Sequence, residues 1–393
     1  MTKKSDTPAI RFKGFTDTWE QRKLGEVATE MVAGGDIDKD LILDEGRYPV
    51  IANALTNDGI VGYYNEDYRI KAPAVTITGR GDVGHAKARI VDFTPVVRLL
   101  SLKSNHDVFF LENAINTLKI VIESTGVPQL TVPQLAKYEI SFPKSLDEEE
   151  KIGVYFKQLD NLITLHQRKY DKLTNVKKSM LEKMFPKNGS NVPEIRFKGF
   201  TEAWEQRKFG EVGETYTGLS GKSKDDFGHG SGKFITYMNV FSNPVASSNM
   251  TEAIEIDDSQ NKVQFGDVLF TTSSETPDEV GMSSVWLENA ENTYLNSFCF
   301  GYRPTTEYNP YYLAYMLRSS SMRKKITFLA QGISRYNISK NKMMDIEMPI
   351  PSIDEQKQIG EYFRNLDNLI TLHQRELEKL KNIKKSCLEN MFV

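Results

Sequence analysis

Five loop segments of this sequence carry side chains that could contact the phosphates and base edges of a nucleic acid. Arginine and lysine pair with phosphates and with guanine, asparagine and glutamine pair with adenine, and a carboxylate accepts a hydrogen bond from cytosine. Such residues gather on glycine-containing stretches such as ITGRGDVGHAKAR (77–89) and GISRYN (332–337). The alternative for each residue is an ordinary solvated loop position. The candidate nucleic-acid-binding residues are Arg80, Lys87, Arg89, Gln129, Lys222, Lys224, Ser273, Ser274, Glu275, Arg335, Tyr336 and Asn337.

Three other motifs fall short of the catalytic patterns that they resemble. GRGDVG (79–84) fits a dinucleotide-binding spacing, but the next segment reads as a strand instead of a helix, which indicates a hairpin loop. GLSGKS (218–223) resembles a phosphate-binding loop, but Tyr216 stands where the first glycine is needed. Pro277 and Asp278 could begin a metal-dependent nuclease motif, but no suitable Glu-x-Lys follows. With no methyltransferase-type motif either, the chain is predicted to be non-catalytic.

The residue types that ligate metals show no ligand spacing. The two cysteines, Cys299 and Cys387, form no CxxC pair, and the five histidines form neither HxxxH nor HxH. Structural zinc sites use closely spaced ligands, and disulfide frameworks use several cysteines. We therefore expect no metal, no disulfide and no cofactor bound by this chain itself, in a reducing cytoplasmic setting.

Composition sets broad limits on the class of protein. The 393 residues are enough for two or three domains, and the net charge of −3 with a pI near 6.1 is unlike that of a strongly basic nucleic-acid-binding protein. Local basic strips could still act on DNA. No apolar run reaches the ~18 residues of a membrane span, and the start MTKKSDTPAI lacks the apolar region of a secretory signal. No membrane association is expected.

The elements that would position the loops are written twice in the chain. IRFKGFTDTWEQRKLGEV (10–27) returns as IRFKGFTEAWEQRKFGEV (195–212), with 15 of 18 positions identical. Residues 160–185 return as residues 367–392 with 19 of 26 identical, while the segments between the repeated blocks diverge. A duplication of domain size favours a pseudo-two-fold arrangement, in which the repeated frame is fixed and the inserts differ.

The second repeated block predicts a pair of long helices. Ser145 and Glu148, and again Ser352 and Glu355, have the S-x-x-E spacing of a capping box. Apolar or histidine side chains then recur every seven residues, as in a coiled coil. We expect the two helices to pack antiparallel, because a pseudo-two-fold axis across the pair requires it. The alternative is two separate amphipathic helices. The predicted interface residues are Ile152, Leu159, His166, Leu173, Met180, Ile359, Leu366, His373, Leu380 and Cys387.

The inserts read as mixed α/β structure with the same order of elements in both halves. Short strands are predicted at 48–53, 59–65, 72–78, 86–93 and 96–102, and then at 232–241, 262–273, 280–288 and 292–304. Helices are predicted at 107–124, with Asp107 as N-cap, and at 310–330, with Pro310 at the start. The fold class is therefore α+β: two mixed α/β domains in pseudo-two-fold arrangement, joined by two long helices packed as an antiparallel coiled coil. The boundaries are 1–144, 145–187, 188–351 and 352–393.

Taken together, these motifs resemble the specificity subunit of a type I restriction-modification enzyme. The resemblance rests on EEKIGVYFKQLDNLITLHQRK with its copy DEQKQIGEYFRNLDNLITLHQRE, on GISRYNISKNKMMDIEMPIPS, on GDVLFTTSSETPDEVG and on the duplication itself. It covers nearly the whole chain. The first copy departs from the pattern, since GVPQLTVPQL stands in place of the GISRYNIS loop.

The resemblance implies that residues 1–144 and 188–351 are target recognition domains, each reading one half of a split, asymmetric site in double-stranded DNA. The helices would set the gap between the halves and dock two modification subunits, which bind S-adenosylmethionine and methylate adenine. Restriction subunits, which use ATP and Mg, would complete an ATP-dependent nuclease.

Two other functions remain open at this stage. A non-catalytic coiled-coil scaffold with two protein-binding heads would fit the long heptads and the acidic pI, and it predicts no DNA footprint with any partner. A stand-alone nuclease or methyltransferase would need turnover by the purified chain with metal or S-adenosylmethionine alone.

Overall fold

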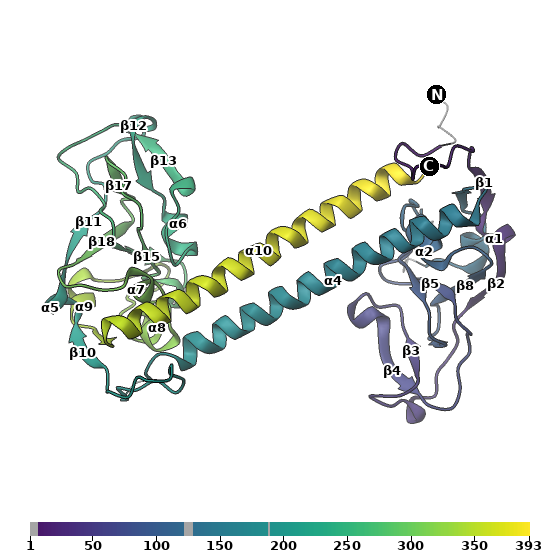
Figure 1. The fold of residues 1–393 in the computed structure, drawn as a ribbon, viewed down its shortest axis with the longest axis horizontal. Coiled ribbons are helices and arrows are strands. Elements are labelled where there is room, and N and C mark those ends of the chain that lie inside the picture. The colour runs from purple at the N-terminus through teal and green to yellow at the C-terminus, as the bar shows by residue number, and fades with distance from the viewer. Residues whose placement is uncertain (1–6, 122–128, 188) are drawn as a thin grey trace. The chain divides into compact units, whose positions relative to one another are not determined.

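The computed structural model describes residues 7–121, 129–187 and 189–393, and it divides into two compact units. Unit 1 comprises Met1–Arg168 and Gln374–Val393, and unit 2 comprises Lys169–His373. Two long helices, α4 (Leu146–Lys183) and α10 (Ile353–Met391), each contribute one half to each unit (Figure 1). Each unit is therefore built from one insert, one copy of the opening repeated segment and parts of both long helices.

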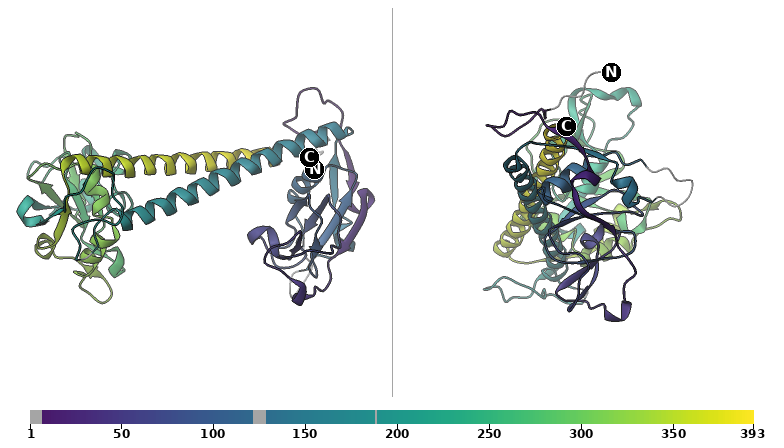
Figure 2. Two further views of the ribbon diagram at one scale, coloured as in Figure 1. Left: turned by 60° about the horizontal axis from the view of Figure 1, so that its bottom comes forward. Right: turned by 90° about the vertical axis from the view of Figure 1, so that its right-hand side faces the viewer.

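Unit 1 contains a four-stranded antiparallel sheet, a three-stranded sheet and a two-stranded sheet, in the orders β2-β8-β5-β6, β4-β3-β7 and β1-β9. Helix α2 packs on β5 and β6 of the larger sheet (Figures 1 and 2). The bounds are β1 Glu20–Lys23, α1 Leu24–Val27, β2 Ala28–Ala33, η1 Lys39–Leu41, β3 Tyr48–Ile51, η2 Thr56–Gly59, β4 Ile60–Tyr64, β5 Ala74–Ile77, β6 Ala86–Arg89, β7 Thr94–Pro95, β8 Leu100–Ser104, α2 Val108–Asn116, α3 Val132–Leu135 and β9 Glu139–Phe142.

Unit 2 repeats these three sheets in the same order, as β11-β18-β14-β16, β13-β12-β17 and β10-β20, and adds a short pair, β15-β19. Since the inserts share almost no sequence, the order of strands is what the duplication preserved. The bounds are β10 Glu205–Lys208, α5 Phe209–Val212, β11 Gly213–Thr217, η3 Lys224–Asp226, β12 Phe227–Ile235, α6 Tyr237–Ser242, η4 Ser248–Met250, β13 Thr251–Ile254, β14 Val268–Thr271, β15 Ser273–Ser274, η5 Pro277–Glu279, β16 Ser283–Val285, β17 Thr293–Leu295, β18 Cys299–Pro304, α7 Pro310–Met316, α8 Ser320–Thr327, β19 Tyr336–Asn337, α9 Lys340–Met344 and β20 Glu347–Ile350.

The predicted antiparallel packing of the helices is confirmed by the contacts within each unit. In unit 1, Asp160 of α4 pairs with Lys384 of α10 at 2.6 Å. In unit 2, Lys177 of α4 pairs with Asp367 of α10 at 2.5 Å. These two pairs are the same pair of sequence positions with the helices exchanged, so the repeat produces matching contacts in both units. Half-exposed ion pairs of this kind stabilise by at most about 1 kcal/mol each.

Most of the heptad positions supply the apolar side of the helix packing. Ile152 and Leu159 are buried in the core of unit 1, and Ile359 and Leu366 are buried in the core of unit 2. Four others, Leu173, Met180, Leu380 and Cys387, are partly buried against these same cores. His166 and His373 are also half-buried.

The end of each long helix completes the aromatic core of a unit. Phe392, just after α10, packs on Phe156 with ring centroids 5.7 Å apart, and on Trp19 and Phe110. Phe185, just after α4, contacts the corresponding Phe363, Trp204 and Tyr312 in unit 2. Aromatic side chains contribute a large share of core stability because each buries a large apolar area. The repeated segments are thus held by one set of contacts, made twice.

The opening repeated segment is fixed by a buried arginine–glutamate pair in each unit. Arg11 donates two hydrogen bonds to Glu148, at 2.6 and 2.8 Å, and Arg196 donates two to Glu355, at 2.7 and 2.8 Å. The predicted capping boxes are wrong in this respect, because the two glutamates receive arginine side chains. Ser352 does cap α10, since its Oγ accepts a hydrogen bond from the Glu355 N–H at 3.4 Å.

We expect Arg11→Ala to destabilise unit 1 more than Arg196→Ala destabilises unit 2. Each change leaves a carboxylate that is 1% exposed without its cation, which costs about 3 kcal/mol or more. Glu355 would keep the hydrogen bond from the Trp204 indole at 3.1 Å, whereas the Trp19 indole N–H is buried without a partner among the described residues. Denaturant unfolding of the full chain measures both losses. Equal losses would show that the tryptophan bond contributes nothing.

A second difference between the units lies at the start of α2 and α7. Asp107 caps α2 by accepting from the N–H groups of Phe109 and Phe110 at 3.0 and 2.8 Å, and Asn309 caps α7 in the same way. Burial raises the pKa of Asp107, and nearby glutamates raise it further, while the two backbone bonds lower it.

Asp107→Asn should therefore stabilise unit 1 at neutral pH and have a vanishing effect at low pH. A carboxyl group whose folded pKa is raised is fully accommodated below its ordinary pKa of about 3.8 and loses stability as the pH rises through the folded value. Asparagine keeps the capping oxygen and does not ionise. Thermal melting at about pH 3, below the ordinary pKa, and at about pH 7 measures the difference. A variant that is less stable than the parent chain at pH 7 would contradict this assignment.

Three predicted elements differ from the structure for local reasons. The strand predicted at 232–241 ends at Ile235, because Thr236 then caps the short helix α6. The helix predicted at 310–330 is two helices, since Ser319 caps α8. The helix predicted at 107–124 ends at Asn116, and residues 122–124 lie outside the described part of the chain. Two predicted strands also differ: 292–304 is two strands, β17 and β18, and 262–273 is a strand of a larger sheet only at β14, while Ser273 belongs to β15. The remaining predicted strands overlap strands of the two larger sheets of each unit.

Candidate nucleic-acid interface

In unit 2, strands β15 and β19 bring two of the candidate loops together. Ser273 lies opposite Asn337 and Ser274 lies opposite Tyr336 in an antiparallel pair. A hairpin closes beside them through two backbone hydrogen bonds between Gln331 and Asn337, at 3.0 and 2.8 Å. Residues some 60 positions apart in sequence thus form one surface, which we call the β15–β19 surface and which comprises residues 273–275 and 331–337.

The side chains of this surface differ in their access to solvent. Ser273 and Ser274 are buried, and the Ser274 Oγ donates to Glu279 at 3.2 Å, so both serines support the loop from inside. Tyr336 is half-buried. The candidate residues exposed on the surface are Glu275, Arg335 and Asn337.

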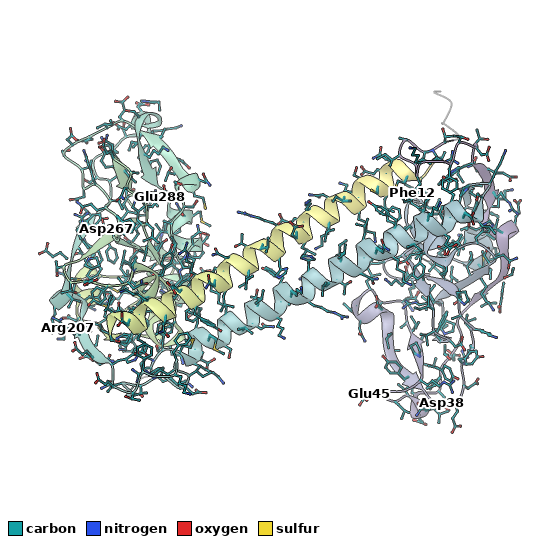
Figure 3. All side chains as sticks on the ribbon, in the orientation of Figure 1. Phe12, Asp38, Glu45, Arg207, Asp267 and Glu288 are labelled. Carbon is teal, nitrogen blue, oxygen red and sulfur yellow. The ribbon has the colours of Figure 1, made fainter. Side chains whose placement is uncertain are left out.

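The strands that carry the β15–β19 surface are anchored by a buried carboxylate, Asp267 (Figure 3). It is 1% exposed and accepts hydrogen bonds from Arg303 at 2.9 and 2.7 Å and from the Tyr216 hydroxyl at 2.7 Å. Burial and the neighbouring carboxylate raise the pKa of Tyr216, so its hydroxyl remains a donor. Charge-assisted bonds of this type fix β11, β14 and β18 together.

In unit 1, Arg80 and Gln129 are the corresponding pair. They form an isolated antiparallel bridge, the counterpart of β15-β19. Next to it, the Gly79 N–H donates to the side chain of Asn53 at 2.8 Å, and the Asn53 amide donates to the Val97 carbonyl at 3.1 Å. Arg80 is exposed. The structure thus brings together two candidate residues that are 49 positions apart in sequence.

Lys87 and Arg89 lie elsewhere, in a cavity of about 350 Å³ between β6, α2 and the last turns of α10. Arg89 donates to Thr76 at 2.9 Å and to the Asp58 carbonyl at 2.8 Å, and burial lowers its pKa. Lys87 lies 3.6 Å from Glu112, whose pKa burial raises. Both cations therefore already have protein partners and tie β6 to its neighbours.

Lys222 and Lys224 lie on the loop between β11 and β12. Lys222 pairs with Asp257 at 2.8 Å, and this hydrogen bond raises the pKa of the lysine and lowers that of the aspartate. Lys224 is exposed. Of the two, Lys224 is the one placed to contact a phosphate.

One of the sequence motifs set aside as non-catalytic takes the expected form. GRGDVG connects β5 and β6, which pair antiparallel, so the predicted hairpin loop is confirmed. Among the described residues, no group of three His, Cys, Asp or Glu side chains could hold a metal ion. Within the same part of the chain, no helix is both long enough and apolar enough to span a membrane.

Sequence reasoning missed three exposed apolar side chains around the β15–β19 surface. Phe298 is 56% exposed, Phe328 is 87% exposed and Ile333 is 95% exposed. The Arg335 guanidinium lies 5.9 Å from the centre of the Phe298 ring. Ile333 lies within the motif GISRYN, but isoleucine has no hydrogen-bonding group that could read a base edge, so residue type gives no sign of a role.

Comparison with known proteins identifies the class. Residues 16–175 and 201–382 both match the type I restriction modification DNA specificity domain. These two segments cover most of the chain and fall on its two halves. The chain therefore belongs to the type I restriction-modification DNA specificity family.

One relative matches this chain over most of its length, a second matches part of it, and a solved structure shares the fold. The specificity subunit of the type I restriction enzyme MjaVIII from Methanocaldococcus jannaschii is 23% identical over 414 aligned positions, which span 95% of this chain and 91% of the relative. The specificity subunit of StySPI from Salmonella potsdam is 32% identical over 124 positions, 32% of this chain and 27% of the relative. A crystal structure of the S subunit from M. genitalium shares the fold, with a TM-score of 0.61 at 15% identity over 98% of this chain and 99% of the other.

Proposed function

We propose that this chain is the DNA sequence-specificity subunit of a type I restriction-modification complex. The recognition loops of unit 1 and unit 2 each read one half of a bipartite, asymmetric site in double-stranded DNA. The long helices set the gap between the two halves and dock two modification subunits. Those subunits bind S-adenosylmethionine and methylate adenine, and restriction subunits with ATP and Mg add cleavage. This chain supplies recognition and no catalytic step.

The observation that carries the proposal is the contrast between the repeated frame and the inserts. Both units use the same ion pairs, the same aromatic contacts and the same order of strands. Their loop surfaces differ, with Arg80 and Gln129 on one and Glu275, Arg335 and Asn337 on the other. A shared frame suits two like partner subunits, and different loops suit two different half-sites.

The docking role finds support in a pair of exposed leucines on each helix. Leu162 and Leu165 of α4 are 43% and 45% exposed, and the matching Leu369 and Leu372 of α10 are 43% and 52% exposed. Solvent-facing leucines at i and i+3 form a small apolar face. Because the same face occurs once in each half, it suits two copies of one partner.

Leu162→Glu should therefore reduce the number of bound modification subunits from two to one, and Leu162→Glu with Leu369→Glu should reduce it to none. A charge buried at an apolar contact weakens that contact, typically by more than tenfold. Native mass spectrometry of the assembled complex measures the stoichiometry. Thr371→Glu, which adds the same charge at another exposed position of α10, serves as the control. Retention of two subunits by the double variant would contradict this docking site.

The proposed function is tested by methylation-resolved sequencing of DNA from cells that express this chain with a matching modification subunit. A new methylated-adenine motif in two parts, separated by unread bases, is the expected result and identifies the target. Assembly of the complex without a new motif would instead favour the non-catalytic scaffold with two protein-binding heads.

A further inference from the structure

Two side chains, one on the β15–β19 surface and one just before it in the chain, are the most exposed large apolar groups in the described part of the chain. Ile333 is 95% exposed and Phe328 is 87% exposed, and Phe298 nearby is 56% exposed. Single exposed apolar residues are common, but groups of them on one protein surface mark contact sites.

The backbone holds Ile333 and Phe328 outward. Ile333 lies at the tip of the hairpin closed by Gln331 and Asn337, and the N–H of Ile338 bonds to the Thr272 carbonyl at 3.0 Å. Phe328 follows α8, whose Met322 and Ile326 are buried in the core of unit 2. The exposed side chains therefore stand on a hydrogen-bonded and packed base, which is the condition for a preorganised contact.

Cations lie next to these apolar side chains. Lys324 is exposed one helical turn before Phe328, so the two share a face of α8. Arg335 follows Ile333 by two residues and lies over the Phe298 ring. The exposed carboxylates nearby, Glu275, Asp278 and Glu279, belong to the other loop, whose turn η5 packs on α8. Apolar side chains flanked by cations match the chemistry of DNA, where phosphates surround a stack of apolar base faces.

We propose that Phe328 and Ile333 act as wedges that enter a base step of the half-site bound by unit 2, while Lys324 and Arg335 contact the flanking phosphates. This inference rests on the proposed function, because it specifies how one recognition surface engages DNA. Insertion removes two large side chains from water and partly unstacks the bases, which kinks the duplex away from the inserted side chains. Unit 2 would then read the deformability of its half-site as well as its base edges.

The test uses the full chain with its modification subunits and DNA that carries 2-aminopurine, whose fluorescence rises when stacking is lost. The probe, an adenine analogue, replaces in turn each adenine within or next to the unit 2 half-site except the methylated adenine, which a methyltransferase extrudes on its own account. We expect a severalfold rise at one step with the parent chain. Phe328→Ala with Ile333→Ala should abolish the rise and weaken binding about tenfold or more.

Matched variants separate insertion from loss of apolar surface. Phe265→Ala removes another phenylalanine of unit 2 that is 54% exposed, and it should behave as the parent chain does. Ile333→Leu keeps the apolar volume and should retain the rise. Thermal melting checks that every variant is folded.

The remaining outcomes distinguish failure of the wedge from failure of the specificity function. DNA that is bound and methylated without any fluorescence rise would overturn the wedge and leave the specificity function intact. A complex that neither binds nor methylates DNA would overturn the specificity function itself. If the double alanine variant kept the rise but lost a modification subunit, the surface would be a protein-docking site and the wedge would be wrong.

Discussion

Exchanging residues 28–131 for the corresponding segment of a relative with a different target will replace one half of the methylated motif and leave the other half unchanged. The exchanged segment contains both larger sheets of unit 1, helix α2 and the bridge between Arg80 and Gln129. It excludes α1, α3 and β9, through which the insert joins the repeated frame. Methylation at the original half-site should be lost completely, because each mismatched base pair weakens DNA binding by about 1–3 kcal/mol.

The junctions of this exchange follow from backbone contacts. The N–H groups of Leu24 and Gly25 bond to the carbonyls of Tyr138 and Ala136, at 2.9 and 3.0 Å. A Cβ atom on Gly25 would lie 3.0 Å from that of Ala136, so this contact accepts little change. Leaving residues 24–25 and 136–138 unchanged therefore keeps this junction intact.

Methylation-resolved sequencing reads the outcome of the exchange. The reciprocal exchange of residues 213–339 should change only the other half of the motif. A change in both halves, or in neither while methylation continues, would contradict the assignment of one half-site to each unit.

The repeated frame could be predicted from the sequence because its patterns occur in both halves of the chain. The heptad spacing of Ile152, Leu159, Leu173 and Met180 recurs in the second copy, and each copy confirms the other. The same succession of strands along both halves was also predictable, since turn residues separate most of the short strands, but their order within the sheets was not. Features that depend on a single local hydrogen bond could not be predicted. One is the start of α8, where Ser319 caps a new helix, because the hydrophobic periodicity gives no sign of such a cap.

Competition between partners explains why the glutamates of the predicted capping boxes bind arginine side chains instead. Glu148 and Glu355 have the spacing to reach back to the start of their own helix. A guanidinium offers two parallel charge-assisted bonds, which are stronger than one bond from a backbone N–H. Arg11 and Arg196 lie more than 130 residues earlier in the chain, so sequence spacing gave no sign of them.

The candidate site was predicted from residue type, and residue type alone does not indicate whether a side chain faces the solvent or the core. Ser273, Ser274, Lys87 and Arg89 are suitable base or phosphate readers that the fold turns inward or pairs with its own groups. Ile333 is an unsuitable type that the hairpin turns outward. Burial depends on tertiary packing, and neither composition nor spacing contains it.

Removing one heptad from each long helix is the second change with a large expected effect. Deleting residues 166–172 and 373–379, which leaves the four exposed leucines in place, should reduce methylation of the original motif by more than tenfold. Seven residues shorten a helix by about 10 Å, which corresponds to about three base pairs of DNA. Three base pairs also turn the duplex by nearly a third of its helical repeat, so the original spacing no longer presents both half-sites correctly.

The double deletion is designed to leave the packing within each unit intact. The ion pairs Asp160–Lys384 and Lys177–Asp367 both lie outside the deleted segments. Because a full heptad is lost from each helix, the apolar stripe continues with a rotation of only about 20°. The aromatic cores around Phe392 and Phe185 are likewise untouched.

The control replaces the same fourteen positions with unrelated residues of the same apolar pattern, and it should keep the original motif. Sequencing of the deletion variant should then find the same two half-sites with a gap shorter by about three base pairs, or no methylation where DNA twist forbids that gap. Methylation of the original motif at the parent rate would show that helix length does not set the spacing. The recognition role of the loops would survive that result, because the exchange of residues 28–131 tests it independently.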